Sequence, residues 1–330
     1  MQKKTDFSLR DIYTAKNRIR PIAQKTPLIP SPSLSELIAS SVHLKYEGLQ
    51  PTGSFKIRGA ANKLLSLTDE EKSRGVIAFS TGNHGRAVAA VARRLGIRAV
   101  ICLSKRVPQY RVDAMRQLGA EVAVHGASQD EAYEHALGLQ REQSLTMIKP
   151  FDDPFVIAGQ GTIGLELLDD LPGIDTAIVP VSGGGLIAGI AFALKSADPS
   201  IRVIGVSMEC APAMYHCLKA GRPIEIEEKD SLADALLGGI GLDNEHTFPM
   251  TQQYVDDLVL VSEDEIARAM FYALDRHHLV VEGSGAVGIS ALLSGKVPNA
   301  GKNVALVISG SNVDVSLLTK IAVEQNSKSN

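Results

Sequence analysis

The sequence predicts an α/β fold with parallel sheets, and three observations support this prediction. Short apolar runs rich in β-branched residues alternate with segments of helical period along nearly the whole chain of 330 residues. The apolar runs are continuous, which is typical of parallel strands that are buried on both faces. Glycine clusters lie between several runs and the helices that follow, where such sheets place their ligand-binding loops.

The individual elements follow from this alternation. The expected strands are Val42–Tyr46, Val76–Ser80, Ala99–Leu103, Glu121–His125, Ala177–Val181, Val203–Ser207 and Val304–Ser309. The expected helices are Arg86–Leu95, Gln109–Leu118, Gln129–Glu142, Leu186–Ser196 and Glu263–His277. The stretch Thr176–Leu194 carries no charge, but Pro180 and the glycines after Ser182 interrupt it, so we expect a strand, a turn and a helix there instead of a membrane span.

Composition excludes several classes of protein. With 34 basic and 37 acidic residues the net charge is −3, and aromatic residues make up only 5%, so neither charge nor stacking indicates a nucleic-acid partner. The N-terminus lacks the apolar core of a signal peptide. Cys102, Cys210 and Cys217 form no disulfide framework. We therefore expect a soluble cytoplasmic protein without a membrane or nucleic-acid partner.

Lys56 follows Ser54, a residue type that favours the N-cap of a helix, so we expect Lys56 in a first helical turn. The positive end of the helix dipole disfavours a charged ammonium there and favours the neutral amine that covalent catalysis requires. Taken alone, the same residues also fit an exposed lysine at the start of a surface helix.

Two further loops lie between a strand and a helix. In Ser80–Arg86, backbone amides and hydroxyls can hold a carboxylate, and Asn83 can donate to a phenolate-type oxygen. In Val181–Gly189, successive glycine amides can converge on a phosphate. Either loop, taken singly, also fits a plain tight turn.

A nucleotide is the other ligand that the glycine-rich loop could hold. The loop lacks the Lys-Ser/Thr ending of a nucleotide triphosphatase. A nicotinamide-dependent oxidoreductase stays open, but it requires an acidic residue roughly 20 positions further on, and Asp198 comes too early.

Together, Ser-Phe-Lys-x-Arg-Gly around Lys56, the Asn-His loop, the glycine-rich loop and the late Ser-Gly-x-Asn resemble the serine/threonine dehydratase family over nearly the whole chain. The resemblance implies a fold type II pyridoxal-phosphate enzyme, similar to tryptophan synthase β, with two open parallel-sheet domains and the cofactor in the cleft between them. Residues 1–74 and 153–330 would form a large cofactor-binding domain, and residues 75–152 a small substrate-gating domain. A homo-oligomer, dimer or tetramer, is implied as well.

The resemblance also assigns roles by matching motif. Lys56 would bind pyridoxal phosphate covalently and serve as the base at the substrate Cα, with Ser80 and Thr81 as further catalytic residues. Asn83 would donate to the cofactor's 3′-oxygen, Ser309 would meet its pyridine nitrogen, and Glu282 would lie close to its ring. The remaining implied cofactor contacts are Phe55, Ser182, Gly183, Gly184, Gly185 and Leu186. The implied contacts with the substrate carboxylate are Ser80, Thr81, Gly82 and His84.

The implied activity is that of an ammonia-lyase, or dehydratase. It would convert a small β-hydroxy amino acid, L-threonine or L-serine, to a 2-oxo acid and ammonia by α,β-elimination. The alternatives within the family are a 3-hydroxyaspartate dehydratase, a hydroxyectoine-pathway dehydratase and a serine racemase. His84, Arg86 and Arg111 are the cationic candidates for a second substrate carboxylate.

Three departures from relatives narrow these expectations. Thr81 stands where similar racemases carry a second serine, which disfavours racemisation. The acidic metal ligands of those racemases fall on Ser207 and Ala213, with Glu209 out of register, so no metal site is expected. The length fits a catalytic core without a regulatory domain, so we expect no feedback inhibition by isoleucine.

Overall fold

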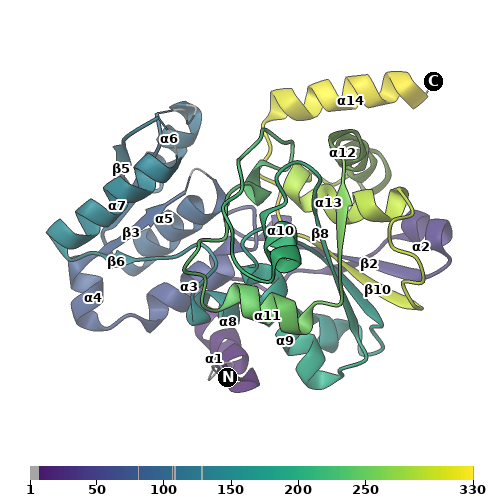
Figure 1. Ribbon diagram of the computed structural model, residues 1–330, viewed down its shortest axis with the longest axis horizontal. Coiled ribbons are helices and arrows are strands. Elements are labelled where there is room, and N and C mark those ends of the chain that lie inside the picture. Colours follow the sequence, from purple (N-terminus) through teal and green to yellow (C-terminus); the bar gives the residue numbers. More distant parts are fainter. Residues whose placement is uncertain (1–6, 81, 106, 108, 128, 330) are drawn as a thin grey trace.

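Two parallel sheets organise the chain, whose computed structural model describes residues 7–80, 82–105, 107, 109–127 and 129–329. The larger sheet has the strand order β1-β2-β10-β7-β8-β9, and all its pairs are parallel except β1 with β2. Its strands are β1 (Leu28–Pro30), β2 (Ser41–Tyr46), β7 (Thr176–Pro180), β8 (Arg202–Met208), β9 (Asp257–Val261) and β10 (Asn303–Ile308). It occupies the right-hand lobe of Figure 1.

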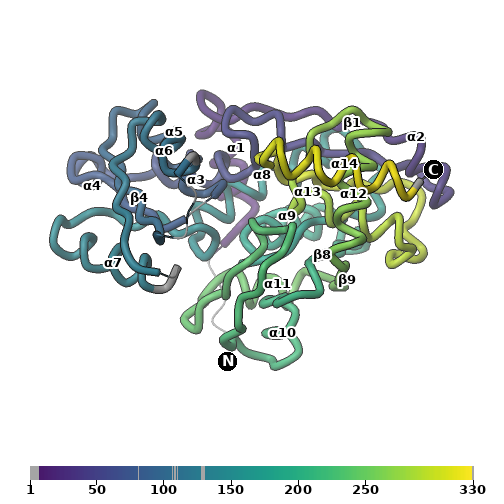
Figure 2. Tube along the Cα trace, turned by 90° about the horizontal axis from the view of Figure 1, so that it is seen from above, coloured from purple at the N-terminus to yellow at the C-terminus, as the bar shows by residue number. Residues whose placement is uncertain are grey.

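The smaller sheet is entirely parallel and lies in the left-hand lobe, in the order β5-β4-β3-β6. Its strands are β3 (Val76–Phe79), β4 (Ala99–Leu103), β5 (Glu121–Val124) and β6 (Thr146–Met147). Figure 2 shows the same separation from above, with α4 to α7 on one side and α9 to α14 on the other.

Helices cover both faces of both sheets. In the first half of the chain they are α1 (Leu9–Ile19), α2 (Pro32–Ile38), α3 (Lys56–Ser66), α4 (Asp69–Arg74), α5 (Asn83–Leu95), α6 (Gln109–Gln117) and α7 (Gln129–Gln143). In the second half they are α8 (Pro154–Asp170), α9 (Gly185–Ala197), α10 (Ala213–Ala220), α11 (Thr247–Tyr254), α12 (Glu263–His277), α13 (Gly283–Leu293) and α14 (Val315–Ser329). Two 3₁₀ turns, η1 (Glu47–Leu49) and η2 (Asp234–Leu236), complete the elements.

Strand β10 shows why the larger sheet is buried on both faces. Val304, Leu306 and Ile308 point into a core with α12 and α13, whereas Ala305 and Val307 point into a second core with α9. Because side chains alternate across a strand, a continuous apolar run fills both cores at once. The prediction of parallel sheets between layers of helices is therefore confirmed.

Every predicted strand and helix forms within a few residues of its expected limits. The elements without a prediction include β1, β6 and β9 and the apolar helices α8 and α13. Strand β6 has only two residues, too few to show a pattern. The predicted N-cap at Ser54 is wrong: α3 begins at Lys56 with Phe55 as its N-cap. Ser54 instead pairs with Gly310 in an isolated antiparallel bridge, which removes it from the helix.

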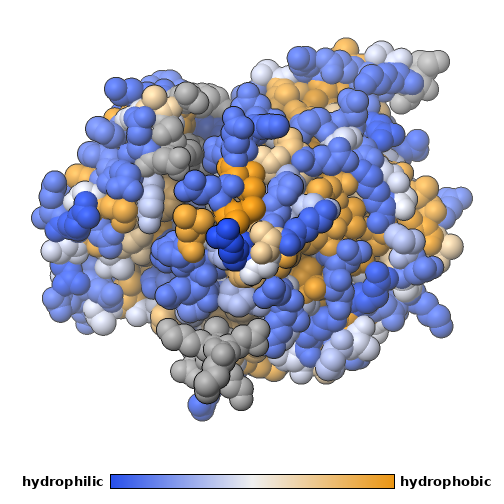
Figure 3. Space-filling model, viewed as in Figure 1, coloured by the Kyte–Doolittle hydropathy of each residue, from blue (hydrophilic) through white to orange (hydrophobic). Residues whose placement is uncertain are grey.

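The uncharged stretch Thr176–Leu194 forms β7, the glycine-rich turn and most of α9, as predicted. No helix among the described residues is both long and apolar enough to cross a membrane. On the face shown in Figure 3, hydrophobic residues appear as small areas among hydrophilic ones.

Helix α3 lies between the two sheets. Its Ile57, Ala60 and Leu64 share a core with β3 and β4 of the smaller sheet, while the helix also packs on α8 beside the larger one. The start of α3, which carries Lys56, is therefore held from both sides. The division of the chain at residues 75 and 152 remains a prediction.

Candidate active site

The loops predicted to carry the chemistry meet at the carboxyl ends of β3, β7 and β10. The segment before α3 is tied to the loop after β10, because the Phe55 amide donates to the Ser309 carbonyl at 3.0 Å. The Ser54–Gly310 bridge adds a second tie. These contacts place the first turn of α3 at the end of the central strand.

Lys56 has an amine with an unusual environment. Its Nζ donates to the Pro150 carbonyl at 2.8 Å and lies 5.2 Å from the centre of the Phe55 ring. Burial lowers the pKa of Lys56 from 10.5 to about 8. Lys56 is thus a side chain with a substantial neutral fraction near neutral pH, which a surface lysine does not have.

The glycine-rich loop Ser182–Gly185 presents amides at the start of α9. Gly184, the N-cap, has φ +88°, a left-handed conformation that favours glycine. Among the described residues no backbone carbonyl accepts from the amides of Gly183, Gly184, Gly185 or Leu186. Free amides at a helix N-terminus form a site for an anion such as phosphate.

The segment Pro150–Asp153 joins the lysine to this loop. Pro150 accepts from Lys56, and the ring of the next residue, Phe151, packs on Gly183, where an added Cβ would lie 2.3 Å from it. Asp152 accepts from the amides of His246 and Thr247 at 2.9 and 3.0 Å, which anchors the segment to the start of α11. The amine and the glycine amides therefore belong to one site.

Asn83 and Glu282 form a further part of the candidate site. Asn83 Nδ2 donates to Glu282 Oε1 at 2.7 Å, and the Asn312 amide donates to Glu282 Oε2 at 3.1 Å. Glu282 is 3% exposed, and burial, with a smaller contribution from Asp234, raises its pKa from 4.5 to about 7. Glu282 thus stands near the balance between its two protonation states at neutral pH.

The other predicted residues are placed as follows. Ser309 is buried, and its Oγ donates to the Ser284 carbonyl at 3.5 Å. Ser80 Oγ accepts from the Gly82 amide at 3.4 Å. His84 Nε2 donates to the Ile148 carbonyl at 2.8 Å. Thr81 lies outside the described residues.

The surroundings of His84 do not favour the positive charge considered for it. Burial and the nearby Lys56 lower the pKa of His84 to about 3, so its ring is neutral and supplies no positive charge for a second substrate carboxylate. The other cationic candidates are engaged elsewhere. Arg86 donates to Asn312 Oδ1 at 3.2 Å, and Arg111 pairs with Asp234 at 2.8 Å.

A network of buried charges lies directly behind Lys56. Arg58, 1% exposed, donates to both oxygens of Glu47 at 2.7 and 2.8 Å and to both oxygens of Glu166 at 2.6 and 2.8 Å. Lys45 pairs with Glu166 at 2.7 Å. The network ties the first turn of α3 to β2, η1 and α8.

The residues of the site fit pyridoxal phosphate, the cofactor that the resemblance implies. Lys56 offers an amine to an aldehyde, the glycine amides offer donors to a phosphate, and Asn83 and Ser309 offer polar groups to a ring. Thr52 Oγ1 and Ser54 Oγ, in the segment before α3, are buried without a hydrogen-bond partner among the described residues. Unpartnered polar atoms of this kind favour a site that a polar ligand completes.

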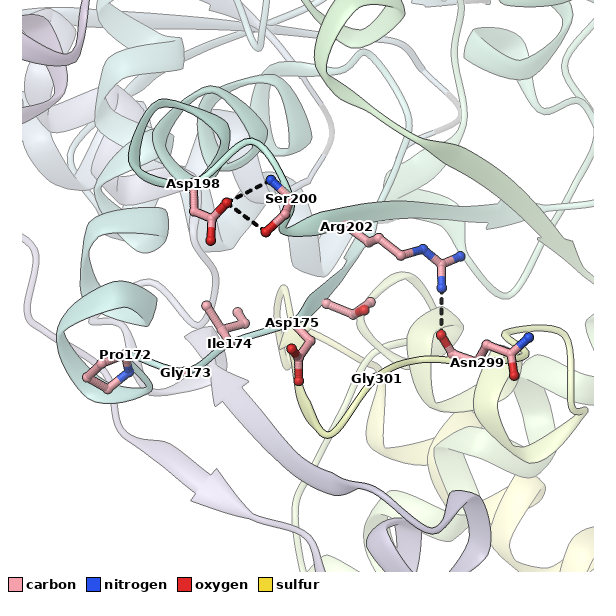
Figure 4. A pocket seen from close by; sticks show the side chains of 10 residues that line it. Pro172, Gly173, Ile174, Asp175, Asp198, Ser200, Arg202, Asn299 and Gly301 are labelled. Carbon is pink, nitrogen blue, oxygen red and sulfur yellow. Dashed lines mark hydrogen bonds between the residues drawn. The ribbon is translucent and has the colours of Figure 1, made fainter.

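A separate pocket of about 370 Å³ opens at the opposite end of the strands of the larger sheet (Figure 4). Asp175, Asp198, Ser200 and Arg202 line it, at the amino ends of β7 and β8. Ligands of open α/β sheets bind at the carboxyl ends instead. Asp198 lies at the amino ends of the strands, so it cannot hold a ribose at the glycine-rich loop, which follows the carboxyl end of β7. The nicotinamide-dependent oxidoreductase considered above therefore lacks the acidic residue that it requires.

Ser207 and Ala213, the positions that the resemblance aligns with metal ligands, form no metal-binding cluster among the described residues. Ser207 Oγ contacts the sulfur of Met208, and Glu209 pairs with Lys296 at 3.3 Å. Within the part of the chain that the structure describes, no group of three His, Cys, Asp or Glu side chains could hold a metal ion.

Sequence reasoning missed four residues of the site. Phe151 and Asp152 lie outside the motifs of the sequence analysis, and Pro150 contributes through its carbonyl, which no side-chain motif shows. Asn312 was part of the late Ser-Gly-x-Asn motif without a role. The Pro-Asp-rich sequence Pro150–Pro154 was the signal that could have identified the first three.

Comparisons with known proteins agree with this geometry. Residues 19–310 match the family described as pyridoxal-phosphate dependent enzyme. An L-threonine ammonia-lyase of Thermotoga maritima is 45% identical over 96% of this chain and 78% of its own length. A catabolic L-threonine dehydratase of Staphylococcus aureus is 43% identical over 95% of this chain and 91% of its own. The structure of maize serine racemase matches with a TM-score of 0.91 at 33% identity, covering 98% of this chain and 99% of that one.

Proposed function

Because the chain belongs to the pyridoxal-phosphate dependent enzyme family, we propose that it is a lyase that converts L-threonine or L-serine to a 2-oxo acid and ammonia. One observation carries the proposal. The amine of Lys56 and the free amides of Gly183–Leu186 are joined through Pro150 and Phe151 into one site. Relatives named as threonine dehydratase or ammonia-lyase support the reaction class.

The residues of the site would hold the cofactor at three places. The amides of Gly183–Leu186 would bind its phosphate, Asn83 would donate to its phenolic oxygen, and Ser309 would meet its pyridine nitrogen. When bound, pyridoxal phosphate supplies an aldehyde for covalent attachment and a conjugated ring that stabilises negative charge at the substrate Cα.

Lys56 moves the proton in this proposal. Since its pKa is about 8, its Nζ can accept the Cα proton near neutral pH. The Pro150 carbonyl, which accepts a hydrogen bond from Nζ, orients the amine. The β-hydroxyl would then leave as water with the proton that Lys56 took from Cα, and hydrolysis would release the nitrogen as ammonia and the carbon skeleton as a 2-oxo acid.

Ser309 favours elimination over reactions in which negative charge must persist at the substrate Cα. A hydroxyl cannot hold a proton on the pyridine nitrogen as a carboxylate would, so negative charge at Cα is less stabilised. Prompt loss of a β-hydroxyl is the outcome that such a site favours. Racemisation would need a second acid on the opposite face, and at the position where the resemblance implies a second serine in racemases this sequence has Thr81.

A 3-hydroxyaspartate substrate is disfavoured, because the three cationic candidates for its second carboxylate are neutral or bound to other residues. His84 is neutral, Arg86 is bonded to Asn312 and Arg111 is paired with Asp234. The pocket of about 380 Å³ beside Glu282 is also lined by Asp230, Asp234, Glu263 and Asp314. Such acidic surroundings repel a second substrate carboxylate.

The experiment is a substrate panel on the purified chain with pyridoxal phosphate. L-threonine, L-serine, D-serine and 3-hydroxyaspartate are supplied separately, and 2-oxo acid and ammonia are measured in equal amounts. We expect the highest kcat/KM for L-threonine or L-serine, and loss of product in Lys56→Ala. A higher kcat/KM for 3-hydroxyaspartate, or D-serine formed faster than oxo acid from L-serine, would overturn the substrate assignment.

The role of residues 75–152, the oligomeric state and the cellular location complete the proposal. Residues 75–152 would act as the substrate-gating unit, because they contact the rest through Asn83–Glu282 and Arg111–Asp234. The chain would work as a homo-oligomer, which sedimentation velocity tests. A cytoplasmic location is supported by its three free cysteines, two of them buried, and fractionation of cells tests it.

A further inference from the structure

A chain of hydrogen bonds runs from the surface to Asn83. Arg86 Nη1 donates to Asn312 Oδ1 at 3.2 Å. Asn312 Nδ2 donates to the Thr52 carbonyl at 2.9 Å and to Asn83 Oδ1 at 2.6 Å. Asn83 Nδ2 then donates to Glu282 Oε1 at 2.7 Å. We call these four side chains, Arg86, Asn312, Asn83 and Glu282, the amide relay.

The ends of the relay fix its direction. A guanidinium only donates and a backbone carbonyl only accepts, so Arg86 and the Thr52 carbonyl together allow one orientation of the Asn312 amide. In that orientation Asn312 presents an N–H to Asn83, which must answer with Oδ1. The Asn83 Nδ2 therefore faces Glu282 and the site. The orientation follows from donor chemistry and not only from the placement of atoms.

Two glycines make room for the relay. Gly53 has φ +75°, and a Cβ there would lie 2.4 Å from Asn312 Oδ1. A Cβ on Gly310 would lie 2.4 Å from Glu282 Oε1. Backbone on both sides thus approaches the relay closely enough to exclude other arrangements of these two side chains.

The relay also joins the two sheets. Asn83 and Arg86 lie at the start of α5, on the smaller sheet, whereas Asn312, Thr52 and Glu282 lie in loops around the larger one. Asn83 and Asn312 are 229 positions apart in the sequence. Asn83 is therefore oriented by groups that contact it only while α5 lies against the larger sheet.

We propose that Asn312 is a positioning residue that fixes the amide of Asn83 with Nδ2 toward the cofactor site. The inference rests on the proposed function, in which Asn83 donates to the cofactor's phenolic oxygen. Glu282 cannot fix this orientation by itself. Its carboxyl is partly protonated near neutral pH and could then donate to Asn83 Oδ1 instead of accepting from Nδ2.

Two substitutions separate positioning from space filling. Asn312→Asp keeps the shape, but a carboxylate only accepts, so it would draw Nδ2 of Asn83 away from the site. Asn312→Ala removes the constraint without imposing the reverse one. Positioning predicts that the Kd for pyridoxal phosphate rises at least about tenfold in Asn312→Asp, which is about 1.4 kcal/mol. It predicts only about a two- to threefold rise in Asn312→Ala, where a fraction of the molecules keeps the correct orientation. A space-filling role predicts the larger effect for alanine.

A double-mutant cycle with Asn83→Ala removes a confounding effect. The added charge of Asn312→Asp would repel an anionic cofactor even without Asn83. If Asn312 acts through Asn83, the effect of Asn312→Asp falls below about twofold in the Asn83→Ala background. Asn303→Asp is the matched control, because Asn303 also donates to a backbone carbonyl, that of Gly173, at 2.8 Å. Asn303 begins β10, so it lies at the opposite end of this strand from the site. We expect no change of Kd in this control.

The measurement is a titration of the cofactor-free full-length chain with pyridoxal phosphate, followed by absorbance, with circular dichroism to verify folding. A wild-type chain that binds no pyridoxal phosphate would refute the proposed function itself. A wild-type chain that binds, together with additive effects of Asn83→Ala and Asn312→Asp, or with a larger effect in Asn312→Ala, would refute the relay and leave the proposed function standing.

Discussion

Replacing Arg58 with methionine should destabilise the fold through the buried charges behind Lys56. In the structure Arg58 makes four hydrogen bonds to the oxygens of Glu47 and Glu166, and all three side chains are at most 6% exposed. Methionine has a similar length but no donors. The substitution would leave Glu47 buried without its cation, while Lys45 would still compensate Glu166.

The magnitude follows from this geometry. Breaking a buried ion pair by removing one partner costs about 3–5 kcal/mol, because the remaining charge stays desolvated. Four charge-assisted hydrogen bonds at roughly 1.5–3 kcal/mol each would exceed that range, but their effects are not additive. We therefore expect a loss of about 3–5 kcal/mol in the free energy of unfolding.

The assay is urea denaturation followed by circular dichroism at one fixed concentration of pyridoxal phosphate. Arg98→Met is the matched control, since Arg98 also binds a carboxylate with two hydrogen bonds of 2.7 Å, to Glu121, but on the surface. Exposed pairs contribute roughly 0–1 kcal/mol. An equal loss in both variants, or a loss below about 1 kcal/mol in Arg58→Met, would refute the reasoning.

The loss should also depend on pH. In the wild type, burial raises the pKa of Glu47, but Arg58, Thr26 and Lys45 together outweigh burial and lower that pKa, so Glu47 contributes stability above its unfolded pKa and loses it as the pH falls. In Arg58→Met burial is no longer opposed by Arg58, which raises the pKa of Glu47. The difference in the free energy of unfolding between variant and wild type should then be largest above the raised pKa of Glu47 and shrink as the pH falls through that pKa, where Glu47 takes up a proton. A difference that grows on acidification would contradict this sign.

Three further predictions concern the site itself. Gly183→Ala should raise the Kd for pyridoxal phosphate at least about tenfold, because its Cβ would lie 2.3 Å from the Phe151 ring. The control Gly138→Ala, whose Cβ meets open space in α7, should leave the Kd unchanged, and equal Kd values for the two variants would contradict the prediction. In the cofactor-free chain, acetylation of Lys56 followed by mass spectrometry should show a midpoint near pH 8, and a midpoint near the ordinary lysine value of about 10.4 would mean that burial does not act on this amine. Neither EDTA nor Mg²⁺ should change the rate of oxo-acid release; activation by Mg²⁺ would show that a metal site was missed.

The sequence predicts the strands well where burial alone decides them. The run Val304–Ile308 is apolar at every position, and only a strand covered on both faces buries it completely. Strand β9 escaped prediction because it lies at the sheet edge, where only its last residue, Val261, is buried. Strand β6 escaped because two residues cannot show a period.

The site was predictable only as a set of separate loops. The resemblance brought Lys56, Asn83, the glycine-rich loop and Ser309 together, whereas local patterns placed each on its own turn. Ser54 shows the limit of local reasoning, since its N-cap preference yields to a pairing with Gly310, more than 250 positions away. The contact of Asn312 with Asn83 has no local signal at all, because it depends on how the two sheets meet.

Attachment of the cofactor to Lys56 is the claim on which the rest depends, and one measurement tests it most directly. The purified chain is incubated with pyridoxal phosphate, reduced with borohydride, digested and sequenced by mass spectrometry. We expect one phosphopyridoxyl group per chain, on Lys56, and none on that peptide when Lys56→Arg is treated in the same way. Modification of other lysines with Lys56 unmodified would contradict the account.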